Sequence, residues 1–186
     1  SPERIATAGR GDLAVRLDRQ HFRHMVDLID RIADLALEHG VTPVVHQHAA
    51  GYIEFEDEIE DVAAALDPAK VGLCVDTGHM AYAGIDPVAF YERHAARVQY
   101  FHFKDIDRAI HAQALAARTP FLDAVAGKIF APLGHGVVRW PDLARAVVSH
   151  GYDGAATVEQ DIDPTVSLNP IEDARASLAY LRSVGF

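Results

Sequence analysis

The sequence predicts an α/β fold built from parallel β-α units, on the basis of three observations. Short apolar runs alternate with amphipathic stretches along most of the 186 residues, an order typical of parallel sheets covered by helices. Hydrophobic residues make up 49% of the chain, enough for one core in a length too short for two ordinary domains. Each predicted strand also ends in polar side chains. We therefore expect residues 1–186 to form a single domain whose functional groups lie at the carboxyl ends of the strands.

Two helices and two strands are predicted in the first part of the chain. Over residues 18–39 apolar side chains recur at three- and four-residue steps, the spacing of one helix face, and Gly40 is a natural helix-ending residue. The run 44–48 follows as a short buried strand. A second helix at 56–66 has acidic residues in its first turn, where the helix dipole favours them, and it leads to an apolar strand at 71–75.

The later elements continue this alternation with one interruption. A helix at 87–94 precedes a strand rich in aromatic residues at 98–103. The connection over 105–136 is long for a compact domain, and because such connections are usually functional we expect it to exclude water from the site. A helix at 140–150, a strand at 155–159 and a closing helix at 170–184 complete the predicted order.

Charge and hydropathy exclude several classes of partner. The net charge of −10 repels phosphate backbones and anionic lipids, and the Lys and Arg residues are scattered, so nucleic acid is not expected as a partner. No apolar stretch approaches the roughly 20 residues needed to cross a bilayer, and residues 1–17 are too charged for a signal peptide. The single cysteine, Cys74, cannot form an internal disulfide and stands in an apolar run. We expect a cytoplasmic protein that contacts no membrane, and a homo-oligomeric state stays open.

The strand ends carry the residues that could perform chemistry. Because the carboxyl ends of parallel strands meet at one edge of a sheet, polar residues there should lie close together. Asp, Glu and His suit divalent cations such as Mn²⁺, Co²⁺, Zn²⁺ or Mg²⁺, and the eleven histidines include several at these ends. The residues therefore favour a metal site at this edge. The four ends read His46-Gln47-His48, Asp76-Thr77-Gly78-His79, His102-Phe103-Lys104-Asp105 and Glu159-Gln160-Asp161.

Each of these residues also has a structural interpretation. Asp76 could cap the segment that follows it, and His79 could be solvated. Glu159 follows an apolar strand, where a carboxylate is costly to bury unless it is paired or bound to a metal, and a salt bridge with Arg139 would satisfy it. Lys104 could be a surface lysine, a substrate anchor or a proton shuttle. The occurrence of all these groups at equivalent strand ends favours a site.

The remaining candidates surround this edge. In a strand, His46 and His48 would point to one face, so that one completes a metal shell and the other contacts the substrate. Glu54 competes with them, although an acid at that position is also useful at the start of the next helix. His135, between two glycines, is placed for loop closure over a ligand. The other histidines are assigned to solvated faces: His21, His24, His39, His94, His111 and His150.

Four segments resemble the xylose-isomerase-like TIM barrel superfamily. They are the runs 44–54, 71–84, 100–105 and 158–161, and within the superfamily they are most similar to the inosose (2-keto-myo-inositol) dehydratase group. The resemblance covers most of the chain from about residue 20 and implies a (β/α) TIM-barrel-type fold. Because the family barrel has eight strands, this chain would supply roughly its C-terminal half.

The resemblance also implies the composition of the site. A Mn²⁺- or Co²⁺-type cation would be held by Asp76, His102 and Glu159. A fourth ligand would come from the strand at 46–48, with His48 as the expected ligand and His46 at the substrate. Related epimerases carry a glutamate in that place, so the histidines here argue against chemistry with two glutamates.

The implied activity is metal-dependent dehydration of an inosose-like polyhydroxy ketone through an enediolate. His48 or Glu159 would remove the proton beside the ketone, while His79 and Lys104 orient hydroxyls or protonate the departing one. An alternative is a ketose epimerase or isomerase of the same superfamily. A third possibility is an inactive, truncated barrel half that acts as an assembly module. An AP-endonuclease-like activity would require DNA binding, which the acidic charge opposes.

Overall fold

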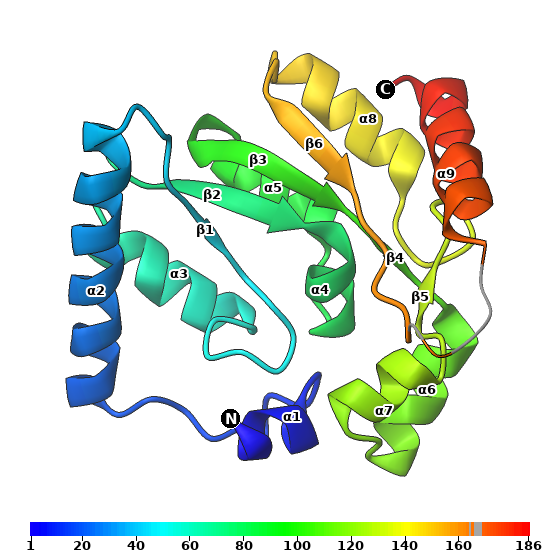
Figure 1. The fold of residues 1–186 in the computed structure, drawn as a ribbon, viewed down its shortest axis with the longest axis horizontal. Coiled ribbons are helices and arrows are strands. Elements are labelled where there is room, and N and C mark those ends of the chain that lie inside the picture. The colour runs from blue at the N-terminus through cyan, green and yellow to red at the C-terminus, as the bar shows by residue number, and fades with distance from the viewer. Residues whose placement is uncertain (164, 166–168) are drawn as a thin grey trace.

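The computed structural model describes residues 1–163, 165 and 169–186, and its centre is a four-stranded parallel sheet (Figure 1). The strand order in the sheet is β1-β2-β3-β6, which is also the order of these four strands along the chain. Each adjacent pair is parallel. This order is that of a barrel, since a doubly wound sheet reverses its strand order. The sheet strands are β1 (Val44–His46), β2 (Gly72–Asp76), β3 (Val98–Phe103) and β6 (Ala155–Val158).

The five predicted helices are present, and the residues expected to delimit them do so. The carboxylate of Asp18 accepts hydrogen bonds from the backbone N–H groups of Gln20 and His21 at the start of the first of them. Gly40, just beyond its end, has a φ of +71°, which glycine adopts without strain. These helices are α2 (Arg19–Glu38), α3 (Glu56–Ala65), α5 (Pro87–His94), α8 (Trp140–Ser149) and α9 (Pro170–Val184).

The main core lies between one face of the sheet and these helices. Leu73 and Val75 of β2 pack there with Phe101 of β3 and with Trp140 of α8. Burying a side chain of this size contributes roughly 1.5–3 kcal/mol, so this face fixes the register of the strands. Because side chains alternate along a strand, Cys74 and the end of β2 face the opposite side.

The connection over 105–136 is not the loop that we expected. It contains β4 (Asp105–Ile106), α6 (Arg108–Ala117), α7 (Phe121–Ala126) and β5 (Phe130–Ala131), with β4 and β5 antiparallel. Asp107 caps α6 by accepting hydrogen bonds from the N–H groups of Ala109 and Ile110. Half of the residues of α6 are alanine, which has the highest helix propensity. Figure 1 shows α6 and α7 beyond the carboxyl ends of the strands.

Three short helical segments were also not predicted. Two strands, β1 and β6, end earlier than the expected residues 48 and 159. The segments are α1 (Pro2–Thr7), α4 (Thr77–Tyr82) and the 3₁₀ turn η1 (Ala95–Arg97). Because α4 begins directly after β2, the chain turns back over the strand end at Asp76.

In the part of the chain that the structure describes, no helix is both long and apolar enough to cross a membrane.

Candidate metal centre

Three predicted ligands converge at the carboxyl edge of the sheet. Asp76 ends β2 and pairs in register with His102 of β3. Glu159 follows β6, and its backbone N–H donates to the carbonyl of Phe103 at 3.0 Å, which holds it beside β3. One ligand atom each from Asp76, His102 and Glu159 lies within 4.8 Å of the others. The strand register therefore brings these side chains together, as the shared edge predicts.

Two buried atoms of this cluster approach one another closely without the alignment of a hydrogen bond. Nδ1 of His102 lies 2.7 Å from Oε2 of Glu159 and 3.6 Å from Oδ2 of Asp76. Among the described residues, neither His102 Nδ1 nor Glu159 Oε2 has an aligned hydrogen-bond partner, although both atoms are buried. Buried polar atoms are rarely left unsatisfied. Two carboxylates and an imidazole that share one small space fit a divalent cation.

Asp76 has a structural role as well as a place in the cluster. Its Oδ1 accepts a hydrogen bond from the N–H of His79 at 2.8 Å and so caps α4. Its side chain is fully buried, and burial opposes ionisation. Contacts with His102 and His46, together with the charge of Lys104, nevertheless hold the pKa of Asp76 well below its usual value. The carboxylate is therefore ionised and can bind a cation.

Lys104 is fully buried among carboxylates, so the surface position considered from the sequence is wrong. Its Nζ lies 3.1 Å from Glu159 Oε1, 3.1 Å from Asp161 Oδ2 and 3.4 Å from Asp76 Oδ2. Burial lowers the pKa of Lys104, but the three carboxylates outweigh it and raise the pKa above its usual value. Lys104 is therefore an ammonium ion at neutral pH.

His79 is a neutral partner of this ammonium group. Nε2 of His79 lies 3.0 Å from Lys104 Nζ and accepts a hydrogen bond from it, which places the ring proton on Nδ1. The ring is buried, and burial lowers the pKa of His79 well below its usual value. The ring of His48 lies against it, with 3.7 Å between the centroids. His79 thus helps to position Lys104 and is not solvated.

His46 and His48 occupy different positions, because β1 ends at His46 and the strand alternation stops there. Nε2 of His46 lies 3.3 Å from Oδ2 of Asp76. Nδ1 of His48 lies 2.7 Å from the carbonyl of Ala49, and a carbonyl only accepts, so Nδ1 carries the proton. Gln47 is buried between them and donates to the backbone carbonyl of Asp76. The structure therefore places His46, and not the expected His48, beside Asp76.

Glu54 lies in a separate structural network. Its carboxylate accepts hydrogen bonds from the N–H of Gly9 at 2.7 Å and of Ala50 at 3.0 Å. It also pairs with the fully buried Arg4 at 3.2 Å. Glu54 therefore ties the N-terminal helix to the segment before α3, a role that differs from the helix-starting acid considered from the sequence.

His135 is exposed, and no contact between its side chain and the cluster is found among the described residues. Asp105 holds the turn that carries it, because its Oδ2 accepts from the N–H groups of Gly134 and Gly136. Arg139, the alternative partner of Glu159, pairs with Asp86 instead.

Asp161 and Cys74 lie at this edge although neither was given a role from the sequence. Asp161 stands in the Glu-Gln-Asp strand end, and Cys74 lies two residues before Asp76, where alternation puts both on one face. Burial raises the pKa of the Cys74 thiol to about 12, and the nearby carboxylate of Asp76 adds to this.

Two histidines assigned to solvated faces, His94 and His111, are half-buried, and Nε2 of His94 lies 2.8 Å from Oε1 of Glu60. Nε2 of His111 lies 3.0 Å from the carbonyl of Tyr82, so this ring is not on a solvated face.

A comparison with protein families identifies the family of this chain. The model of the xylose isomerase-like TIM barrel family matches residues 5–184. The chain belongs to this family. The predicted fold class, a barrel-type α/β chain that supplies part of a barrel, is thereby confirmed.

Curated relatives of the chain are inosose dehydratases. The chain is 32% identical over 158 residues to an inosose dehydratase of Geobacillus thermodenitrificans. The aligned region covers 85% of this chain and 53% of the relative. It therefore spans about half the length of the curated relatives that it matches.

Solved structures agree on the fold. A probable 3-DHS dehydratase, AsbF, from Bacillus anthracis aligns with a TM-score of 0.71 at 19% identity and covers 89% of this chain and 58% of its own. An IOLI protein with a bound zinc atom aligns with a TM-score of 0.68 at 14% identity and covers 91% and 58%.

Proposed function

We propose that this chain forms the metal-binding part of a lyase that dehydrates an inosose-like cyclic polyhydroxy ketone. The observation that carries the proposal is the convergence of Asp76, His102 and Glu159, whose ligand atoms lie within 4.8 Å of one another. The inosose dehydratase relatives support the substrate class, a small polyol.

Asp76, His102, Glu159 and His46 would hold the cation, which we propose to be Mn²⁺ or Co²⁺, since mixed carboxylate and imidazole sets suit such ions. When bound, a divalent cation supplies Lewis-acid polarisation of substrate oxygens and stabilises developing negative charge. The zinc atom of the similar IOLI protein supports a divalent metal at such a site.

His48 is the base that the geometry favours. With the proton of His48 held on Nδ1 by the Ala49 carbonyl, a neutral ring has its lone pair free on Nε2. Glu159, the other base considered from the sequence, is more encumbered, because Lys104 contacts Oε1 and His102 lies against Oε2.

Lys104 is suited to supply a positive charge. Because its carboxylate partners raise its pKa, the ammonium group next to Glu159 and Asp161 would neither give up a proton readily nor act as a base, and it would instead stabilise negative charge at the site. His79 accepts a hydrogen bond from the ammonium group and keeps it pointed at the cluster.

The intact protein, incubated with Mn²⁺ and 2-keto-myo-inositol, should yield a product lighter by one water. A His48→Gln variant should lose turnover by about 10²–10⁴-fold, the usual contribution of a general base, while binding Mn²⁺ as before. A Glu159→Gln variant should lose both turnover and Mn²⁺ affinity. Turnover by His48→Gln at the parent rate would return the role of base to Glu159.

Product mass separates the competing activities. Epimerisation or isomerisation shares the first proton removal but returns the proton to carbon, so a product of unchanged mass would replace dehydratase activity with that alternative. A protein that binds no Mn²⁺ and leaves the ketone unchanged would instead fit an assembly module.

A further inference from the structure

Cys74 lies next to the candidate metal centre, although the proposed reaction does not use it. It stands between Leu73 and Val75, whose side chains enter the main core, so its thiol faces the opposite side of the sheet with Asp76. The side chain is buried, with 2% of its surface exposed, and is the only thiol in the sequence.

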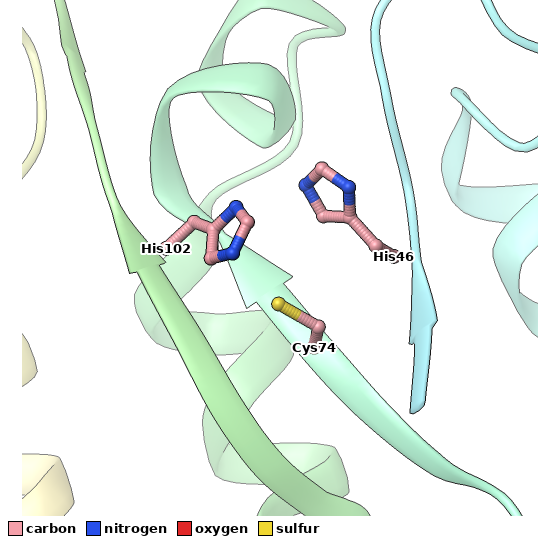
Figure 2. Close-up of side chains that lie close together, drawn as sticks. All are labelled: His46, Cys74 and His102. Atoms are coloured by element: carbon pink, nitrogen blue, oxygen red, sulfur yellow. The ribbon is translucent and has the colours of Figure 1, made fainter. Parts of the chain in front are cut away.

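Two histidines flank this thiol because of the strand register. His46 of β1 is the direct partner of Cys74 of β2, and His102 lies two residues beyond the β3 partner of Cys74. One ring nitrogen from each histidine and the sulfur lie within 4.8 Å of one another. Figure 2 shows the thiol pointing into the space between the two imidazole rings.

This group differs in chemical character from the carboxylate centre beside it. One sulfur and two imidazole nitrogens are ligands that soft or borderline cations prefer, whereas carboxylates suit harder ions such as Mn²⁺ and Mg²⁺. Three converging protein ligands also leave a fourth tetrahedral position for water.

We propose that His46, Cys74 and His102 form a second binding site, selective for thiophilic divalent cations such as Zn²⁺ and Cd²⁺. On binding, the sulfur–hydrogen bond of Cys74 breaks, the sulfur forms a bond to the cation, and the proton passes to solvent. No electron is transferred.

The two sites compete, because His46 and His102 also face Asp76. A thiophilic ion that draws both rings toward Cys74 removes them from the carboxylate centre. The thiol therefore gives this barrel a route to inhibition by Zn²⁺ or Cd²⁺ that a barrel with an apolar residue at this position would lack.

Cadmium titration tests the site directly, because a cadmium–thiolate bond produces an ultraviolet charge-transfer band. The intact protein should develop this band, which saturates at one equivalent of Cd²⁺, and should release bound Mn²⁺ as it does so. A Cys74→Ser variant should lack the band and bind Cd²⁺ at least about 10–100-fold more weakly, a loss that even an outer partner of a metal ligand can cause. Its Mn²⁺ affinity should stay within about two-fold of that of the parent, a change far smaller than the expected loss of Cd²⁺ affinity.

A Glu159→Gln variant is the matched control, since it should lose Mn²⁺ affinity while keeping the cadmium band. This pattern separates the thiol site from the proposed function, because either can fail without the other. X-ray absorption of the Zn²⁺-loaded parent protein needs no variant and should show one sulfur neighbour at about 2.3 Å. A parent protein that gives no thiolate band, or a zinc spectrum with nitrogen and oxygen neighbours alone, would overturn the proposal.

Discussion

At the scale of single residues, the positions of two histidines relative to Asp76 indicate which of them would complete the proposed metal shell. His46 contacts the carboxylate of Asp76, whereas His48 lies against the ring of His79. Glu54, the third candidate, is held by Arg4 and by backbone N–H groups. The three candidates thus have separate physical roles although they stand within nine positions of the chain.

We therefore predict that His46→Ala weakens Mn²⁺ binding by at least about 10–100-fold, while His48→Ala changes it by less than about three-fold. Calorimetric titration of each variant measures the difference. Glu54→Gln serves as the control: its Mn²⁺ affinity should match the parent, but its stability to urea should fall because Arg4 loses a buried charged partner. Equal losses for the two histidine variants would contradict this assignment.

At the scale of elements, the short helix α4 shapes the site by its close approach to β3. An ideal Cβ at Gly78 would lie 2.5 Å from Cγ and 2.7 Å from Cβ of Lys104. The absence of a side chain at Gly78 thus lets the lysine stem pass beneath the helix toward the carboxylates. Thr77 adds to this contact, because its hydroxyl donates to the carbonyl of Lys104 at 2.6 Å.

Gly78→Ala should accordingly destabilise the protein by about 1–3 kcal/mol, the usual cost of inserting a methyl group into a packed region. The free energy of unfolding in urea measures this loss. Gly11→Ala is the matched control, since its nearest contact would be 3.4 Å and its cost should stay within about 0.5 kcal/mol. Equal stability of both variants would show that the lysine stem moves aside freely.

At the scale of the whole molecule, one face of the sheet is covered by helices and the other carries the metal-binding groups. Parallel sheets are normally buried on both faces, yet residues 155–157 of β6 are exposed and His102 is half-buried. The cluster gathers three carboxylates, those of Asp76, Glu159 and Asp161, around a single lysine. Their mutual repulsion is relieved by a bound cation, which should stabilise the folded chain.

Mn²⁺ at about 100 times its dissociation constant should stabilise the protein by about 2.7 kcal/mol, which corresponds to roughly 5–11 °C in the unfolding midpoint of a chain of this size. Differential scanning calorimetry with and without the ion checks this. Asp76→Asn, which removes a ligand charge, should abolish the shift. A shift of the same size in that variant would place the ion elsewhere.

Local patterns were sufficient to predict the four strands of the parallel sheet, the main helices and the polar residues at the end of each of these strands. Such patterns depend on spacing within a short segment, and the edge shared by parallel strands follows from the β-α alternation. The convergence of Asp76, His102 and Glu159 could therefore be expected before the structure was known. The helices of the connection over 105–136 were missed although their capping and alanine content were visible in the sequence.

Only the tertiary structure decided how the side chains pair across distant segments. The burial of Lys104 depends on Gly78, and the role of Glu54 depends on Arg4, 50 positions away. The place of Cys74 between two histidines depends on the register of three strands, which packing of the opposite face sets. Spacing within a segment carries no information on these long-range contacts, because register is chosen by the burial of the whole core.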